Sequence, residues 1–136
     1  MQINTYLTFS GQCEEAFKFY EKLLGGKIGF MMTFKDSPAE SQVPAEWADK
    51  VLHVRLETPA GVLMGSDSPP GRQAKPQGFS VSVSVDDPAE AERIYRGLAD
   101  GALAVTMPMQ ETFWAKRFGM VTDRFGVPWM VNCEKH

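Results

Sequence analysis

The chain has 136 residues, of which 43% are hydrophobic and 23% charged, and its formal net charge at pH 7 is −3. This balance is ordinary for a soluble globular protein, and scattered basic residues outnumbered by acids exclude a nucleic-acid-binding patch. No apolar run approaches the roughly 20 residues of a membrane span, and the first residues lack a signal-peptide pattern. Cys13 and Cys133 have no metal-type or redox-type spacing. We therefore expect a cytoplasmic protein with packed free thiols and no membrane or nucleic-acid partner.

The first half of the chain predicts one β-α-β-β-β unit. An extended run at 5–9 leads into a helix, in which apolar residues from Ala16 to Leu24 recur at helical spacing until Gly25-Gly26. Further strands are expected at 27–34, 51–57 and 62–66. An irregular loop at 36–49 separates the first two of these, and a Thr-Pro-Ala-Gly turn joins the last two.

The second half predicts the same order of elements. Residues 80–85 alternate strictly between serine and valine, which indicates a half-buried strand. Asp87-Pro88 supplies an N-cap and a proline at the first helical position, and the helix is expected to end before Gly101. Three strands should follow, at 102–107, 118–122 and 128–133.

The two halves are related by an offset of 75 residues, which places Tyr20 on Tyr95 and Gly26 on Gly101 without a gap. We therefore predict an α+β protein in which residues 1–136 form a single domain of two tandem β-α-β-β-β modules. The modules span about 1–68 and 78–136, are joined by a Pro/Gly-rich loop, and form a curved mixed sheet that bears a cleft. The same offset places Thr5 on Ser80.

Two segments make the interpretation more specific. Residues 6–20 and 111–132, the second of which includes the run Phe118 to Asn132, resemble the opening and the C-terminal signature of PhnB-like proteins. These proteins are a branch of the vicinal oxygen chelate superfamily, which includes glyoxalase I, bleomycin-resistance proteins and extradiol dioxygenases. The resemblance implies the glyoxalase/bleomycin resistance fold and a homodimer, whose interface is an alternative role for Trp114 or for Met31-Met32.

In metal-dependent members the resemblance implies four ligands, one from the first and one from the last strand of each module. The corresponding positions here are Thr5, Ser80, Met130, and Gly65 or Met64. Hydroxyls are weak ligands and thioethers favour soft ions, so this set does not suit the usual divalent metal. His136 is terminal and expected to be frayed, and His53 stands alone. We expect no metal and no cofactor.

Strand alternation and the aromatic segments indicate which residues should line the cleft that the resemblance implies. In the strand at 51–57, His53 and Arg55 alternate with apolar residues that should pack on helices. Pairing with Glu57 or Asp49 is the alternative role of Arg55, and Trp129 fits the core equally well. The full candidate set is Thr5, Leu7, Phe9, His53, Arg55, Ser80, Ser82, Trp114, Phe118, Trp129 and Met130.

The leading hypothesis is a protein that binds a small molecule in this cleft without a metal, as bleomycin-resistance proteins do. The alternatives are a metal-dependent lyase, transferase or dioxygenase of the same superfamily, acid–base catalysis through His53, and a dimeric interaction module without catalysis. The branch often carries the label 3-demethylubiquinone 3-methyltransferase. The turn at 9–13 lacks the glycine-rich motif of a Rossmann-like methyltransferase, and the order of elements differs, so the sequence does not support that label.

Overall fold

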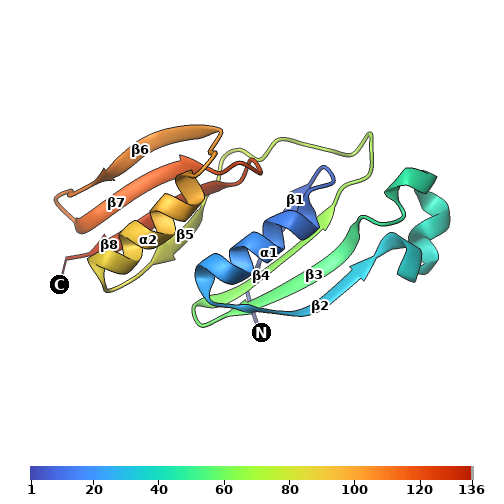
Figure 1. Ribbon diagram of the computed structural model, residues 1–136, viewed down its shortest axis with the longest axis horizontal. Helices are drawn as coiled ribbons and strands as arrows, with labels where there is room; N and C mark the ends of the chain where they lie inside the picture. Colours follow the sequence, from blue (N-terminus) through green and yellow to red (C-terminus); the bar gives the residue numbers. More distant parts are fainter. Residues whose placement is uncertain (136) are drawn as a thin grey trace. The chain divides into compact units, whose positions relative to one another are not determined.

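The computed structural model describes residues 1–135 and divides into two compact units, Met1–Ala74 and Lys75–His136. Within the described residues, each unit has the order β-α-β-β-β and builds its own four-stranded sheet (Figure 1). This confirms the predicted α+β class and the tandem modules. Neither helix of the described part has the length and hydropathy needed to cross a membrane.

In the first unit, the first and last strands are neighbours and run parallel. Its elements are β1 (Thr5–Phe9), α1 (Cys13–Leu24), β2 (Lys27–Thr33), β3 (Val51–Thr58) and β4 (Gly61–Asp67). The sheet order is β1-β4-β3-β2, in which β1 and β4 are parallel and the other neighbours antiparallel. The loop predicted as irregular contains three short 3-10 helices, Phe34–Asp36, Pro38–Gln42 and Ala45–Trp47. Ser37 caps the second of these, whose first residue is a proline, and the amides of Phe34 and Lys35 donate across the loop to the carbonyls of Lys50 and Ala48.

The helix α1 covers one face of the first sheet with the predicted apolar stripe. Its buried residues are Cys13, Ala16, Phe17, Tyr20 and Leu23. Gly25, at φ 70°, ends the helix in the left-handed conformation, as the Gly-Gly stop predicts. A Cβ on Gly65 of β4 would lie 2.7 Å from the Phe17 ring, so the absence of a side chain there lets the ring approach the strand closely.

The second unit has the same topology with different details. Its elements are β5 (Val81–Ser84), α2 (Pro88–Ala99), β6 (Ala104–Gln110), β7 (Ala115–Thr122) and β8 (Pro128–Glu134), in the order β5-β8-β7-β6. The Asp87 carboxylate accepts a hydrogen bond of 3.0 Å from the Ala89 amide, as expected of an N-cap. A Cβ on Gly119 of β7 would lie 2.7 Å from the Tyr95 ring of α2.

The strands of this unit differ in extent from the prediction. β6 tolerates Pro108 because it is an edge strand, and it continues to Gln110 through two irregularities in its pairing with β7. β7 starts earlier than predicted because Ala115 already pairs with Glu134 of β8. Local periodicity does not report such pairing, which is decided by the neighbouring strand.

The offset of 75 holds for the two helices but not for the first strands. Leu7 and Phe9 are buried, and the Phe9 ring makes an edge contact with Phe17 of α1 at 6.0 Å. In β5 the buried residue is Val81, while Ser82 is exposed. Successive strand residues point to opposite faces, and at this offset the exposed Tyr6 falls on the buried Val81, so the two first strands correspond at an offset one residue away from 75. The predicted equivalence of Thr5 with Ser80 is therefore wrong.

One buried carboxylate joins three segments of the first unit. Asp67, at the end of β4 and 2% exposed, accepts hydrogen bonds through Oδ1 from the amides of Gly11 (2.9 Å) and Cys13 (3.0 Å). Its Oδ2 accepts a third bond of 2.9 Å from the amide of Val51 at the start of β3. The start of α1, the end of β4 and the start of β3 are thus fixed to a single side chain.

A second buried carboxylate organises the turn before β8. Asp123, 1% exposed, accepts bonds through Oδ1 from the amides of Phe125 (2.9 Å) and Val127 (3.0 Å). Its Oδ2 accepts a bond of 2.9 Å from Nε1 of Trp129, which satisfies the polar atom of this buried indole.

Replacing Asp67 with alanine should lower the free energy of unfolding by about 3 to 5 kcal/mol, because three backbone N–H groups lose a charged acceptor. Urea denaturation followed by circular dichroism measures this change. The matched control is Asp49→Ala, whose carboxylate pairs with Lys35 at the surface and should leave the urea midpoint nearly unchanged. Equal losses in both variants would contradict a special role for Asp67.

Candidate functional site

Each sheet has one face against its own helix and one face away from it, which we call the open face. Figure 1 shows α1 lying across β4 and β3, and α2 lying across the sheet of the second unit. Side chains that are paired in register across neighbouring strands lie on the same face, so the register assigns each strand residue to one face or the other.

The open face of the first unit carries a continuous row of large side chains across all four strands. In order across the sheet, the row is Tyr6, Met64, Arg55 and Phe30. Tyr6 and Phe30, on the two edge strands, are 45% and 46% exposed. The sheet packs its core on the side of the helix. Packing therefore does not require two half-exposed aromatic rings on the opposite face.

His53 lies beside this row and contacts both rings. Its Nδ1 is 3.2 Å from the Tyr6 hydroxyl, and the two rings are stacked, with centroids 5.7 Å apart and an interplanar angle of 23°. The Phe30 ring lies 6.0 Å from the imidazole at 47°. The hydroxyl and the imidazole orient one another, and the three rings together form an aromatic surface.

Arg55 lies between Phe30 and Met64 in the register and is anchored at one side only. Its Nε donates to Oε1 of Glu57 at 3.2 Å, and its Nη1 lies 3.9 Å from the Met64 sulfur. Of the two alternative partners predicted for it, Glu57 forms the ion pair, and Asp49 pairs with Lys35 instead. The Arg55 side chain is 31% exposed.

The open face of the second unit has a different chemistry. One row across its strands is Ser82, Met130, Met120 and Met107, and the next is Ser84, Asn132, Phe118 and Gln110. The Trp114 ring packs against Phe118 at 5.3 Å and is itself 41% exposed. This face therefore combines hydroxyl and thioether groups with an aromatic edge.

Asn132 carries an unusual feature of this face. Its Oδ1 is buried and has no hydrogen-bond partner among residues 1–135. A buried acceptor without a partner costs free energy, and in native proteins it calls for an explanation such as a functional role.

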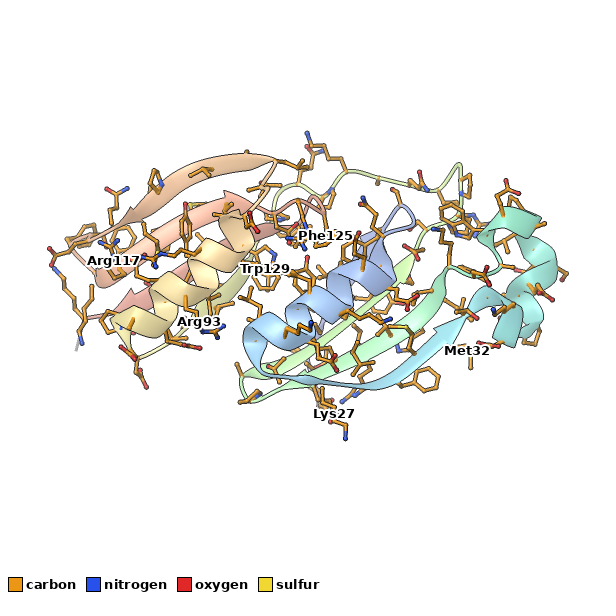
Figure 2. The ribbon with its side chains drawn as sticks, viewed as in Figure 1. Lys27, Met32, Arg93, Arg117, Phe125 and Trp129 are labelled. Carbon is orange, nitrogen blue, oxygen red and sulfur yellow. The ribbon has the colours of Figure 1, made fainter. Side chains whose placement is uncertain are left out.

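Several of the candidate residues predicted from sequence lie on the wrong side of their sheet. Thr5, which pairs with the buried Leu63, lies on the helix side with Leu7 and Phe9. Trp129 is 1% exposed and belongs to the core, next to α2 in Figure 2. Ser80 precedes β5 and has no place in the sheet. Thr5, Leu7, Phe9 and Trp129 are excluded because the helix packs on the face they occupy, and Ser80 because it lies outside the strand.

The remaining candidates fall into two groups, each within its own unit. His53 and Arg55 lie on the open face of the first, and Ser82, Phe118 and Met130 on that of the second, where Trp114 covers Phe118. The residues that sequence reasoning missed are Tyr6, Phe30, Met64, Met120 and Asn132. Matching the apolar residues of the strand at 5–9 with the valines of 80–85, rather than with the serines, would have found Tyr6.

Comparison with known proteins establishes the family. A model of the glyoxalase/bleomycin resistance protein/dioxygenase superfamily matches residues 2–131. The chain belongs to this superfamily. Protein YjdN of Escherichia coli strain K12 is 33% identical over 143 residues, which cover 99% of this chain and 97% of YjdN.

Two solved structures extend the comparison. Protein PA1353 from Pseudomonas aeruginosa is 49% identical, with a TM-score of 0.90 and coverage of 100% of this chain and 99% of that one. A PhnB protein from Bacillus cereus is 24% identical, with a TM-score of 0.80 and coverage of 98% and 99%, and this likeness concerns the fold. The predicted membership of the glyoxalase/bleomycin resistance superfamily is confirmed.

The residues present do not fit the metal that the superfamily resemblance implies. On the first and last strands of each unit, the paired open-face residues are Tyr6 with Met64 and Ser82 with Met130. Phenol, hydroxyl and thioether groups are a poor set for divalent ions, since hard ions prefer carboxylates and Zn, Fe or Ni also bind imidazole. Within residues 1–135, no group of three or more His, Cys, Asp and Glu side chains is placed to hold a metal ion. His136 lies outside the described residues.

The two cysteines are free and buried. Burial raises the pKa of the Cys13 thiol, and the nearby Asp67 carboxylate raises it further, so this thiol stays protonated well above neutral pH. The Cys133 sulfur lies 3.4 Å from the carbonyl oxygen of Asp86, to which it donates. Neither environment is that of an activated nucleophile.

Cys13 of the native protein should resist alkylation by iodoacetamide at about pH 8, where an ordinary exposed thiol reacts readily through its thiolate. A raised pKa leaves little thiolate at this pH, and burial blocks access. Mass spectrometry of tryptic peptides measures the labelled fraction, and unfolding in guanidinium before labelling should release both thiols. Rapid modification of Cys13 in the folded protein would contradict this assignment.

Proposed function

We propose that this superfamily member binds small molecules against the open face of a sheet, each unit providing its own surface, and that it does so without a metal ion. The observation that carries the proposal is the presence of large, half-exposed rings on these faces: Tyr6, Phe30 and Trp114. Ligand sites combine apolar and aromatic walls with a few polar groups that fix orientation. Here the polar groups are His53 and Arg55 in one unit, and serine hydroxyls with Asn132 in the other.

The carboxamide of Asn132 supports this proposal independently of exposure. Folding desolvates its Oδ1 without giving it a partner within residues 1–135. If the Asn132 side chain turns to present this oxygen on the open face, a ligand that donates a hydrogen bond to it would offset that cost beside Ser84 and Phe118.

A dimeric interaction module is the second candidate. Phe113 is 89% exposed and packs edge-on against Trp114 at 4.8 Å, and on β6 Val105 is 51% exposed. Apolar groups at this level of exposure favour association with another protein surface, and a second copy of the chain is the partner that the superfamily resemblance suggests.

Methyl transfer is not part of the proposal. The name of the Bacillus cereus PhnB protein includes 3-demethylubiquinone-9 3-methyltransferase, but its 24% identity concerns the fold. The fold consists of two small mixed sheets, each with one parallel pair, and lacks the open parallel sheet at whose switch point a Rossmann-like enzyme binds its cofactor.

A panel of small aromatic and aliphatic acids, amines and amides at millimolar concentration should contain compounds that shift the backbone amide resonances of open-face residues. Binding near Trp114 should also change tryptophan fluorescence, and Trp114→Phe should lose part of that change while Trp47 and Trp129 report the remainder. Prior treatment with EDTA should leave the responses unaltered. No shift with any compound, or responses abolished by EDTA and restored by a divalent ion, would overturn the proposal.

Asn132→Leu should raise the free energy of unfolding, or leave it unchanged, while it weakens compounds that shift the resonances of β8. The substitution removes a desolvated oxygen that has no partner, and the expected gain is about 1 kcal/mol. The control is Gln110→Leu in the same row, whose amide is exposed. A clear loss of stability in Asn132→Leu alone would show that the carboxamide has a structural role instead.

A further inference from the structure

We propose that the open face of the first unit binds a planar aromatic or conjugated anion, with the rings of Tyr6, His53 and Phe30 beneath its plane and Arg55 at its acidic group. This inference rests on the proposed function and adds the chemical class of ligand. It is carried by the side chains of one sheet face, all within the first unit, so it needs no contribution from the second.

The shape of the ligand follows from the rings. The Tyr6 ring and the His53 imidazole lie at 23° to one another with centroids 5.7 Å apart, and Phe30 is 6.0 Å from His53 on the other side. The hydroxyl of Tyr6 and the imidazole hold each other at 3.2 Å, so the surface is oriented before any ligand arrives. Stacking onto a surface of this kind rewards a flat π system more than a branched aliphatic one.

The charge of the ligand follows from the acids and bases on the same face. The register pairs Lys27 with Glu57, and Arg55 is on the same face because it is two residues away on β3. In Figure 2, Lys27 points away from α1. Glu57 is the acid that faces them, since Asp67, the other acid on these four strands, is buried against backbone amides. Without counting His53, the face therefore carries two cations, Lys27 and Arg55, and one acid, Glu57.

The position of Arg55 links the two requirements. Glu57 occupies only Nε, the contact of Nη1 is a weak one to sulfur, and Nη2 has no partner among residues 1–135. The guanidinium therefore has N–H groups left to donate to a carboxylate, sulfonate or phosphate. Because Arg55 is the register neighbour of Phe30 and Met64, an anion held there belongs to a molecule whose flat part can reach the rings.

Two probes with the same ring system separate charge from stacking. 8-Anilino-1-naphthalenesulfonate carries a sulfonate, and N-phenyl-1-naphthylamine lacks it. Fluorescence titration of the full chain should give a lower dissociation constant for the sulfonate. Arg55→Gln should weaken the sulfonate about tenfold and leave the neutral probe nearly unchanged, as expected for the loss of one charge-assisted contact. Amide chemical shifts of β1 to β4 then locate the bound probe.

Two further variants complete the experiment. Arg96→Gln, an exposed arginine of α2, changes the net charge equally and should leave both dissociation constants unaltered. Tyr6→Leu keeps an apolar side chain but removes the ring and its bond to His53, so it should weaken both probes several-fold. Circular dichroism and urea midpoints verify that each variant is folded.

The outcomes distinguish this inference from the proposed function. If neutral compounds shift the open-face resonances but the sulfonate shows no preference, or if Arg55→Gln leaves that preference intact, the inference is overturned while small-molecule binding stands. An equal loss in Arg96→Gln would reduce the effect to net charge and overturn it as well. If neither probe nor any compound of the wider panel binds, the proposed function fails together with it.

Discussion

The carboxylate of Asp67 is the interaction on which the arrangement of the first unit depends. A helix that starts with Gln12 has no side-chain cap, and the amides near its beginning would be costly to bury unpaired. Asp67 provides acceptors for two of them and for the first amide of β3, so the last strand holds both the helix entry and the neighbouring strand. The open face depends on the same carboxylate, because Arg55 and Met64 lie on the two strands whose ends it holds together. A functional surface on a small sheet needs such support from the buried side.

The elements of the fold were largely predictable from sequence, because caps and periodicity are local. Asp87-Pro88, Gly25 and the apolar stripes locate both helices, and the duplication supplies the order of strands. Which side chains of residues 5–9 point toward the helix was not predictable in the same way. Thr5 and Thr8 are three residues apart and therefore lie on opposite faces, so polarity does not identify the buried side. The offset of 75 that relates the helices is one residue out of step in this strand and reverses the assignment. The contact of Phe9 with Phe17 determines which face of the strand is buried, and this is a tertiary contact that a local pattern does not report.

The same limit applies to the candidate site. His53 and Arg55 were found because both neighbours of each are apolar, which is a strong local signal for the open side. Tyr6, Phe30 and Met64 enter the site only through the register of β1, β2 and β4 against β3, which places residues from distant parts of the chain in one row. Asn132 lies within the recognised C-terminal signature, yet only the structure shows that its oxygen is buried without a partner. The two open faces have thus diverged in chemistry while the topology stayed the same.

The glycines beneath the two helices show that the helices pack on their sheets in different ways. Phe17 approaches Gly65 on the last strand of its unit, whereas Tyr95 approaches Gly119 on the third. The residue that corresponds to Phe17 in the second helix is Glu92, which forms an ion pair with Arg117 of β7. A helix transplanted from one copy to the other would bring a phenyl ring to the arginine in one case and a carboxylate to an apolar notch in the other. The two halves share one topology, yet each helix carries side chains that fit only the sheet of its own unit.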